Sequence, residues 1–194
     1  GDIKYRDLNG DGVIDDYDKM PIGFCDIPEI TYGFGGAIEW KGFDVSIFFQ
    51  GTARVSLFEE GSTIVPFSSG YKNNDGFLRG VMENRWTVDN PDPNARYPRT
   101  IRPSDALDNN NTKKSSFWVR NAAFLRLKNA EIGYTFPKRW MEKMAIQNLR
   151  LYVSGVNLLT WAPDVHLFDP DLGSGDGRKY PPTRVFNVGL NINF

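Results

Sequence analysis

The stretch Arg184-Val-Phe-Asn-Val-Gly-Leu-Asn-Ile-Asn-Phe194 decides the fold that this sequence predicts. Its large apolar residues occupy every second position, and the positions between them are mostly small or polar. Such alternation indicates a β-strand with one apolar face and one polar face. Strands of soluble sandwiches usually run about 5–6 residues, whereas a tilted strand that crosses a bilayer needs about 9–11. The length and pattern, ending on an aromatic residue, therefore predict the closing strand of a membrane β-barrel.

Four further segments of the chain show the same alternation. They are residues 30–40, 43–50, 123–136 and 149–161. The first two are separated only by Lys41-Gly42, a spacing that predicts a tight hairpin. In the third segment the apolar residues change parity between Leu127 and Ala130, which indicates either a β-bulge or the point where the strand leaves the membrane.

The connections between these strands alternate between long and short, as in outer-membrane barrels. The short ones are 41–42 and 137–147, the latter with a helical turn at 137–144. The long ones, predicted to be extracellular loops, are 1–28, 52–116 with a short helix near 77–86, and 162–180. Tryptophans also mark the expected membrane borders. Trp40 and Trp140 fall on the short-turn side, and Trp118 and Trp161 fall on the long-loop side.

The composition excludes several other classes of protein. The net charge of −1 gives no bulk attraction for nucleic acid, and no apolar run approaches the roughly 18 residues of a membrane-spanning helix. Negative mean hydropathy is compatible with a barrel, whose interior face is polar. The single Cys25 excludes an intramolecular disulfide. Because the chain opens at Gly1 without an initiator Met or signal peptide, we expect it to be part of a longer sequence.

An acidic, glycine-punctuated loop near the beginning has the ligand spacing of a calcium-binding loop. Oxygen donors stand at loop positions 1, 3, 5, 7, 9 and 12, and Gly12 stands at the sharp turn in position 6. The expected Ca²⁺ ligands are Asp7, Asn9, Asp11, the carbonyl of Val13, Asp15 and Asp18. Because the last ligand is Asp and not a bidentate Glu, we expect modest affinity. The alternative is a solvated turn held by Asx hydrogen bonds.

The sequence offers no constellation for catalysis. His166 is the single histidine, and no nucleophile elbow, histidine pair or P-loop accompanies it, so we expect no enzyme activity and no catalytic residues. Trp86 and Tyr97, in the predicted loop 52–116, are candidates for ligand contact. The alternative for these aromatic residues is packing of the loop on itself.

Several motifs, in order and spacing, resemble those of one known family. They are Gly1-Asp-Ile-Lys-Tyr-Arg-Asp-Leu-Asn-Gly-Asp-Gly12, Tyr32-Gly-Phe-Gly-Gly36, Glu83-Asn-Arg-Trp-Thr87, Ala95-Arg-Tyr-Pro-Arg99, Phe124-Leu-Arg-Leu-Lys-Asn129, Ile132-Gly-Tyr-Thr135, Leu149-Arg-Leu-Tyr-Val-Ser-Gly-Val-Asn-Leu-Leu159 and Tyr180-Pro-Pro-Thr-Arg184. Across nearly its whole length, the chain resembles the C-terminal part of the SusC/RagA-like TonB-linked outer-membrane receptors of Bacteroidetes.

This resemblance implies a 22-stranded barrel in the Gram-negative outer membrane, of which residues 1–194 are the last five strands. It implies import powered through TonB, a SusD-like surface lipoprotein as partner, and oligosaccharide or in some members peptide as cargo. The plug domain that fills such barrels is absent from this sequence. Asn187, Gly189, Ile192 and Phe194 fit the family's terminal membrane-insertion signal, although Ile stands where an aromatic residue is commoner.

Two classes of protein therefore remain to be distinguished. The first is an all-β, antiparallel transmembrane barrel segment of a TonB-dependent transporter. The second is a soluble β-domain with a calcium loop that binds carbohydrate. The barrel exposes one apolar face to lipid, whereas a soluble domain covers that face with a second sheet. The residues that decide between them are Tyr32, Phe34, Ile38, Val45 and Ile47.

Overall fold

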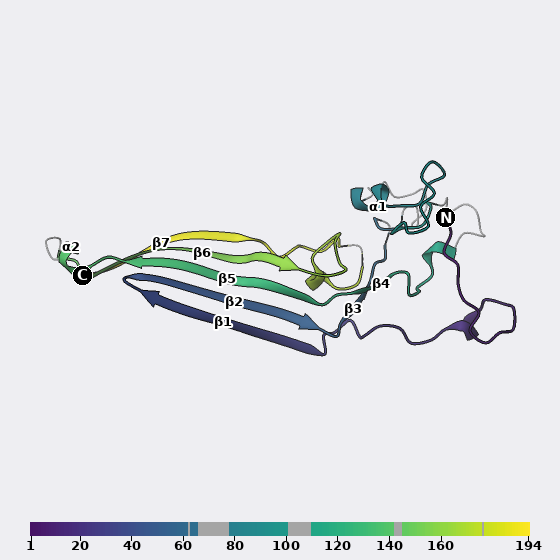
Figure 1. Cartoon of the computed structure of the whole chain (residues 1–194), viewed down its shortest axis with the longest axis horizontal. Coiled ribbons are helices and arrows are strands. Elements are labelled where there is room, and N and C mark those ends of the chain that lie inside the picture. Colours follow the sequence, from purple (N-terminus) through teal and green to yellow (C-terminus); the bar gives the residue numbers. More distant parts are fainter. Residues whose placement is uncertain (62, 66–77, 101–109, 142–144, 176) are drawn as a thin grey trace. The chain divides into compact units, whose positions relative to one another are not determined.

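The computed structural model describes residues 1–61, 63–65, 78–100, 110–141, 145–175 and 177–194. The chain forms two compact units, each drawn from three segments (Figure 1). The sheet unit consists of residues 28–54, 122–163 and 180–194. The loop unit consists of residues 1–27, 55–121 and 164–179.

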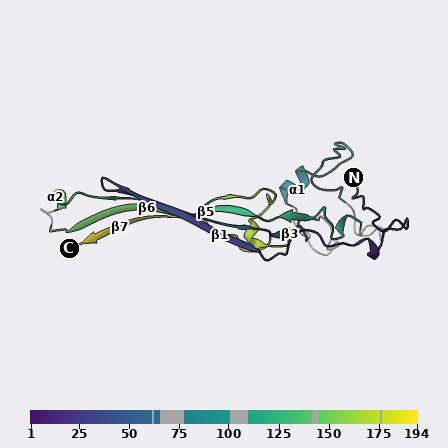
Figure 2. The ribbon, with the colours of Figure 1, turned by 60° about the horizontal axis from the view of Figure 1, so that its bottom comes forward.

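The sheet unit is one antiparallel sheet of five strands in the order β1-β2-β5-β6-β7. The strands are β1 (Ile30–Trp40), β2 (Phe43–Ala53), β5 (Phe124–Thr135), β6 (Asn148–Trp161) and β7 (Val185–Asn193). The sheet is visibly twisted in Figure 2. All five predicted strands are confirmed, within a few residues at their ends.

Both short connections begin and end at the same end of the sheet as the C-terminus (Figure 1). In the β1–β2 hairpin, Lys41 and Gly42 have φ values of 50° and 89°. Two successive positive φ values match the twist of the flanking strands, and glycine adopts such a value without strain. The connection from β5 to β6 contains helix α2 (Lys138–Met141), within the predicted 137–144; residues 142–144 lie outside the described part.

The change of parity in β5 is a β-bulge. On the β2 side, Ile47 pairs with Ala130 but Phe49 pairs with Leu127, and the register shifts between them. On the β6 side, the register shifts again between Leu127 and Asn129. The shifts return Leu127 to the face that carries Ala130, so the apolar face continues past the irregularity.

The apolar face of the sheet is exposed in this structure. Tyr32, Phe34, Ile38, Val45 and Ile47 are between 38% and 73% exposed. Phe186, Val188 and Leu190 of β7 are exposed as well. A soluble domain would bury these side chains in a core, so their exposure favours the transmembrane barrel segment. None of the described helices is long and apolar enough to cross a bilayer.

Among its described residues, the loop unit contains only short elements. They are the 3₁₀ turns η1 (Asp16–Asp18), η2 (Asn110–Thr112) and η4 (Pro170–Leu172), strands β3 (Ser56–Phe58) and β4 (Val119–Asn121), and helix α1 (Arg79–Glu83). Strands β3 and β4 pair antiparallel. Helix α1 confirms the helix expected near 77–86, of which residue 77 lies outside the described part.

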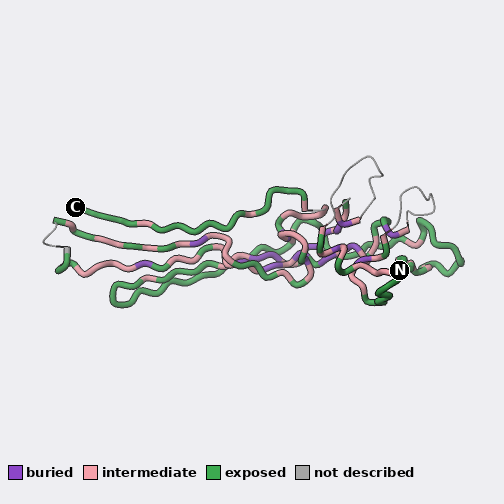
Figure 3. Tube along the Cα trace, turned by 90° about the horizontal axis from the view of Figure 1, so that it is seen from above, coloured by how far each residue is buried: buried purple, intermediate pink, exposed green. Residues whose placement is uncertain are grey.

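A small hydrophobic core holds the loop unit together, and many of the buried residues in Figure 3 gather in this unit. Its centre is Ile64, Val81, Tyr97 and Trp118. The prediction that Trp118 marks a membrane border was wrong, because its side chain is only 3% exposed. Sequence alone did not show that the three predicted long loops contribute to one folded unit.

Candidate functional site

The polar face of the sheet carries an ion cluster that spans three strands. From β6, Arg150 donates from Nε to Oδ1 of Asp44 on β2 over 3.0 Å, and its Nη2 contacts the other oxygen of the same carboxylate. The same Nη2 donates to Glu131 Oε1 on β5 over 2.6 Å. In a barrel this face lines the interior. The cluster therefore places two carboxylates and one guanidinium on the face that would line a barrel interior.

Aromatic side chains on the same face lie over glycines. Phe48 covers Gly33 and Gly35, where an added Cβ would approach the Phe48 ring to 2.9 Å and 3.1 Å. Tyr152 likewise lies over Gly189, and the Arg150 guanidinium is 5.0 Å from the Tyr152 ring centroid. These glycines make room for rings that lie flat along the interior wall instead of standing into it.

The four residues of the expected insertion signal do not share one face. Asn187 and Gly189 of β7 pair with Ser154 and Tyr152 on the polar face, whereas Ile192 pairs with Leu149. Phe194 follows the last residue of β7 and is 79% exposed. Gly189 thus has a packing reason to be glycine, since Tyr152 lies over it. A role in membrane insertion stays a prediction for all four.

The expected calcium loop is held by hydrogen bonds from backbone N–H groups to its own carboxylates. Asp7 accepts from the N–H groups of Gly10 and Gly12 over 2.6 Å and 2.8 Å. Asp18 accepts from the N–H groups of Leu8 and Asp15 over 2.7 Å and 2.9 Å. These donors, that of Asp15 first, lower the pKa of Asp18 below its usual value. Gly12 has a φ of 82°, as the expected sharp turn requires.

The donor chemistry of this loop suits calcium, which prefers carboxylate and carbonyl oxygens. Asp11 and Asn9 are hydrogen-bonded to each other, with the Asn9 amide donating to Asp11 Oδ2 over 2.9 Å. In the described part of the chain, however, no three His, Cys, Asp or Glu side chains converge as metal ligands. An ion bound here would compete with the N–H groups that now occupy the carboxylates. Calcium binding by Asp7, Asn9, Asp11, Val13, Asp15 and Asp18 stays a prediction.

A buried ion network in the loop unit was not predicted. The carboxylate of Glu59 is 0% exposed and accepts from Arg120 Nε over 2.9 Å. Arg96 Nη2 lies 3.5 Å from the other oxygen of Glu59 and donates to the backbone carbonyl of Asp164 over 2.6 Å. A buried carboxylate is stable only when paired, so this network fixes three segments against one another.

Trp86 and Tyr97, the two residues predicted to contact a ligand, are neighbours in the loop unit but differ in exposure. The backbone N–H of Trp86 donates to the backbone carbonyl of Tyr97 over 2.9 Å. Trp86 is half-buried, whereas Tyr97 is 2% exposed and packs 6.3 Å from the Trp118 ring centroid. Burial, together with the charge of Glu59, raises the pKa of Tyr97 above its usual value. Tyr97 is therefore a packing residue of the loop unit, as the alternative interpretation proposed.

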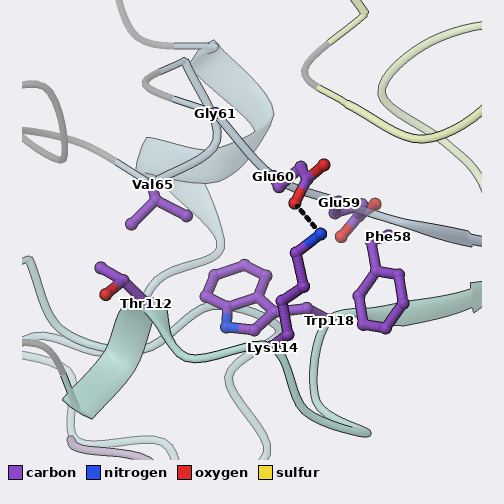
Figure 4. A pocket seen from close by; sticks show the side chains of 8 residues that line it. All are labelled: Phe58, Glu59, Glu60, Gly61, Val65, Thr112, Lys114 and Trp118. Carbon is purple, nitrogen blue, oxygen red and sulfur yellow. Dashed lines mark ion pairs between the residues drawn. The ribbon is translucent and has the colours of Figure 1, made fainter. Parts of the chain in front are cut away.

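A pocket of about 220 Å³ opens beside Glu59 in the loop unit (Figure 4). Its walls include the rings of Phe58 and Trp118. At its rim, Lys114 Nζ lies 3.0 Å from Glu60 Oε2 and 5.3 Å from the centroid of the Phe58 ring. The pocket thus combines aromatic surface with paired charges. No motif in the sequence indicated it, because these residues come together only through folding.

Known proteins similar to this chain are receptors of one kind. The chain is 30% identical over 208 residues to the TonB-dependent receptor P26 of Formosa agariphila, covering all of this chain and 20% of that protein. It is also 30% identical to the TonB-dependent receptor P3 of the same bacterium, covering 98% of this chain and 19% of the relative. The TonB-dependent receptor SusC of Bacteroides thetaiotaomicron is 26% identical, with 98% and 17% covered. No protein-family model matches the chain.

Solved structures agree on the fold. The RagAB peptide transporter matches with a TM-score of 0.66 at 23% identity, covering 94% of this chain and 19% of that chain. The RagAB peptide importer in the closed-closed state matches with a TM-score of 0.66 at 24% identity, covering 89% and 18%. This chain spans about one fifth of the length of the relatives named first. Taken with the five-stranded sheet and its exposed apolar face, the relatives identify the chain as a β-barrel segment of a SusC/RagA-like TonB-dependent receptor, a class of receptors and transporters and not of enzymes.

Proposed function

We propose that the receptor containing this chain imports oligosaccharides across the outer membrane, powered through TonB, together with a SusD-like surface lipoprotein. The observation that carries this proposal is the similarity to TonB-dependent receptors, SusC among them, along almost the whole chain. The polar face of the sheet, with its ion cluster and flat aromatic rings, supplies a stretch of the transport path. Peptide is the second candidate cargo, because the similar solved structures are those of the RagAB peptide importer.

The proposed arrangement places the loop unit outside the cell. If the C-terminus is periplasmic, the short connections at the same end of the sheet are periplasmic as well (Figure 1). The segments 1–28, 52–116 and 162–180 then leave the sheet at the extracellular end, as long barrel loops do. Cargo and lipoprotein would both meet the receptor on that side.

Uptake by intact cells tests this function. Cells that produce the full-length receptor should take up fluorescent neutral oligosaccharides, and deletion of the receptor or collapse of the proton gradient should abolish uptake. Removing the proposed SusD-like lipoprotein should reduce uptake at low substrate concentration. Uptake of labelled peptides alone would replace oligosaccharide by peptide as the cargo. Uptake that persists without a proton gradient would contradict TonB-powered import.

A further inference from the structure

We propose that the pocket lined by Phe58, Glu59, Glu60, Lys114 and Trp118, here called the loop-unit pocket, is a binding subsite for one neutral sugar ring of an oligosaccharide (Figure 4). This inference rests on the proposed function and adds to it a place and a set of contacts. Its volume of about 220 Å³ accommodates a group of the size of a single ring.

The aromatic walls suit the apolar face of a sugar ring. Trp118 is part of the core of the loop unit, which holds its indole in one position. Its indole N–H donates to the Asn111 carbonyl over 3.0 Å, so the polar atom of the ring already has a partner. Rigid aromatic rings with satisfied polar atoms offer contact area at little cost in side-chain entropy. The C–H groups of a sugar ring pack against such surfaces.

The rim of the pocket offers both a donor and an acceptor for hydroxyl groups. Lys114 Nζ carries three N–H donors and lies 3.0 Å from Glu60 Oε2. Adjacent hydroxyls of a sugar each donate and accept a hydrogen bond, so a pair of them can bind the ammonium and the carboxylate together. Such bonds to charged groups are stronger than bonds between neutral groups.

Beside the pocket, the buried carboxylate of Glu59 has one oxygen without a hydrogen-bond donor in the described part of the chain. Its Oε2 accepts from Arg120, but its buried Oε1 receives no hydrogen bond from the described residues. A buried carboxylate oxygen gains from any hydroxyl that reaches it. Arg96, 3.5 Å away, contributes charge but not a hydrogen bond to this oxygen.

The pairing of charges selects a neutral ligand. Glu60 is neutralised by Lys114, and Glu59 is neutralised by Arg120 and Arg96. A cationic side chain of a peptide would have to displace Lys114 before it could reach Glu60. A neutral sugar can hydrogen-bond to both groups from the pocket side while the ion pair stays in place.

The test uses the full-length receptor in detergent, probed with arrays of neutral hexose and pentose oligosaccharides and of peptides. The oligosaccharide that binds best is then titrated calorimetrically against Lys114→Met and Glu60→Gln. The Lys114 side chain is 68% exposed and the Glu60 side chain 45% exposed, so neither is part of the core. The matched controls are Lys113→Met, next in the chain but outside the pocket lining, and Glu83→Gln, which removes an exposed carboxylate from helix α1.

The two pocket variants should weaken binding by about tenfold or more, whereas the two controls should bind like the unaltered receptor. Lys114→Arg, which keeps the charge and the donors, should retain most of the affinity. Unchanged affinity in both pocket variants would overturn the subsite while leaving oligosaccharide uptake in cells intact. Binding to peptides alone, without uptake of any oligosaccharide, would overturn the subsite and the proposed function together.

Discussion

Arg150 on β6 reaches Asp44 on β2 by crossing the intervening strand β5 above Gly133. The strand register places Gly133 of β5 between the two charged residues, because Gly133 pairs with Asp44 on β2 and with Tyr152 on β6. A Cβ atom on residue 133 would lie 2.6 Å from both Arg150 Nη2 and Asp44 Oδ1. The absence of a side chain at one position thus permits an ion pair between strands that are not neighbours.

The first prediction concerns this crossing. Gly133→Ala should push the Arg150 guanidinium away from Asp44 and destabilise the folded barrel by about 1–3 kcal/mol, the usual cost of inserting a methyl group into a filled space. The measurement is the temperature at which the full-length receptor loses its heat-modifiable migration in gel electrophoresis. Gly36→Ala is the matched control, since nothing lies within 4 Å of its added Cβ. Equal melting of the two variants would contradict the role assigned to Gly133.

The second prediction concerns the buried acid of the loop unit. Glu59→Leu should leave Arg120 without its carboxylate partner in a buried site and destabilise the loop unit by about 3–5 kcal/mol. Hydrogen exchange of the full-length receptor should then rise in residues 55–60 and 118–121, while the sheet strands keep their protection. Glu83→Gln, on an exposed carboxylate, should change neither region. Unchanged exchange in Glu59→Leu would show that the network does not stabilise the unit.

The third prediction concerns calcium. The full-length receptor should bind Ca²⁺ with a dissociation constant of about 10⁻⁴–10⁻³ M, the range of extracellular modules, because the loop ends in Asp18 and lacks a bidentate Glu. Asp7→Ala combined with Asp11→Ala should abolish the calorimetric signal. Asp16→Asn is the control, since Asp16 is not among the predicted ligands and pairs with Lys19. No heat and no calcium-dependent change in proteolysis near Gly10 at millimolar calcium would leave only the Asx-turn interpretation.

The fourth prediction is a pH dependence of the same loop in the absence of calcium. Hydrogen bonds from backbone N–H groups lower the pKa of Asp18 in the folded loop. Their stabilising contribution is therefore complete above the ordinary carboxyl pKa of about 3.9 and is lost as the pH falls through the lowered value. Cleavage of the loop by an acid-active protease should rise below about pH 4. Asp18→Asn, which does not titrate, should remove this rise; an unaltered pH profile in that variant would contradict the assignment.

The fifth prediction concerns the C-terminal aromatic residue. Deleting Phe194 from the full-length receptor should lower the amount of assembled barrel in the outer membrane more than the amount synthesised. Phe194→Tyr, which keeps an aromatic ring at the end of the chain, should assemble normally. Quantitative immunoblots of heated and unheated membranes measure both amounts. Equal assembly after deletion would remove Phe194 from the insertion signal.

The strands were predictable because their faces differ in polarity along the chain. Alternation from Phe186 to Phe194 predicts β7. The parity change after Leu127 left open a bulge or the end of the membrane span, and the register shifts show the bulge. The tight turn at Lys41-Gly42 followed from its two-residue length and its glycine. Each of these signals is local, so a single segment contains all the information it needs.

The polar sites were not predictable because they depend on contacts between distant segments. In the sequence, Glu59 is an ordinary charged residue after Leu57 and Phe58, yet its partner Arg120 is 61 positions away. Trp118 was assigned to a membrane border because its place relative to the strands fitted a girdle, whereas tertiary packing buries it with Val81 and Ile64. Aromatic content alone does not distinguish a lipid interface from the core of a small unit.

The shared core of the loop unit also limits how its segments can be exchanged between related receptors. Residues 1–27, 55–121 and 164–179 belong to one compact unit, and its ion network joins Glu59, Arg120 and Asp164. Grafting one of these segments alone from a relative would transfer one partner of several contacts between segments and leave the other partner behind. A functional chimera therefore requires the three segments to be transferred as a set, with the strands of the host barrel left in place.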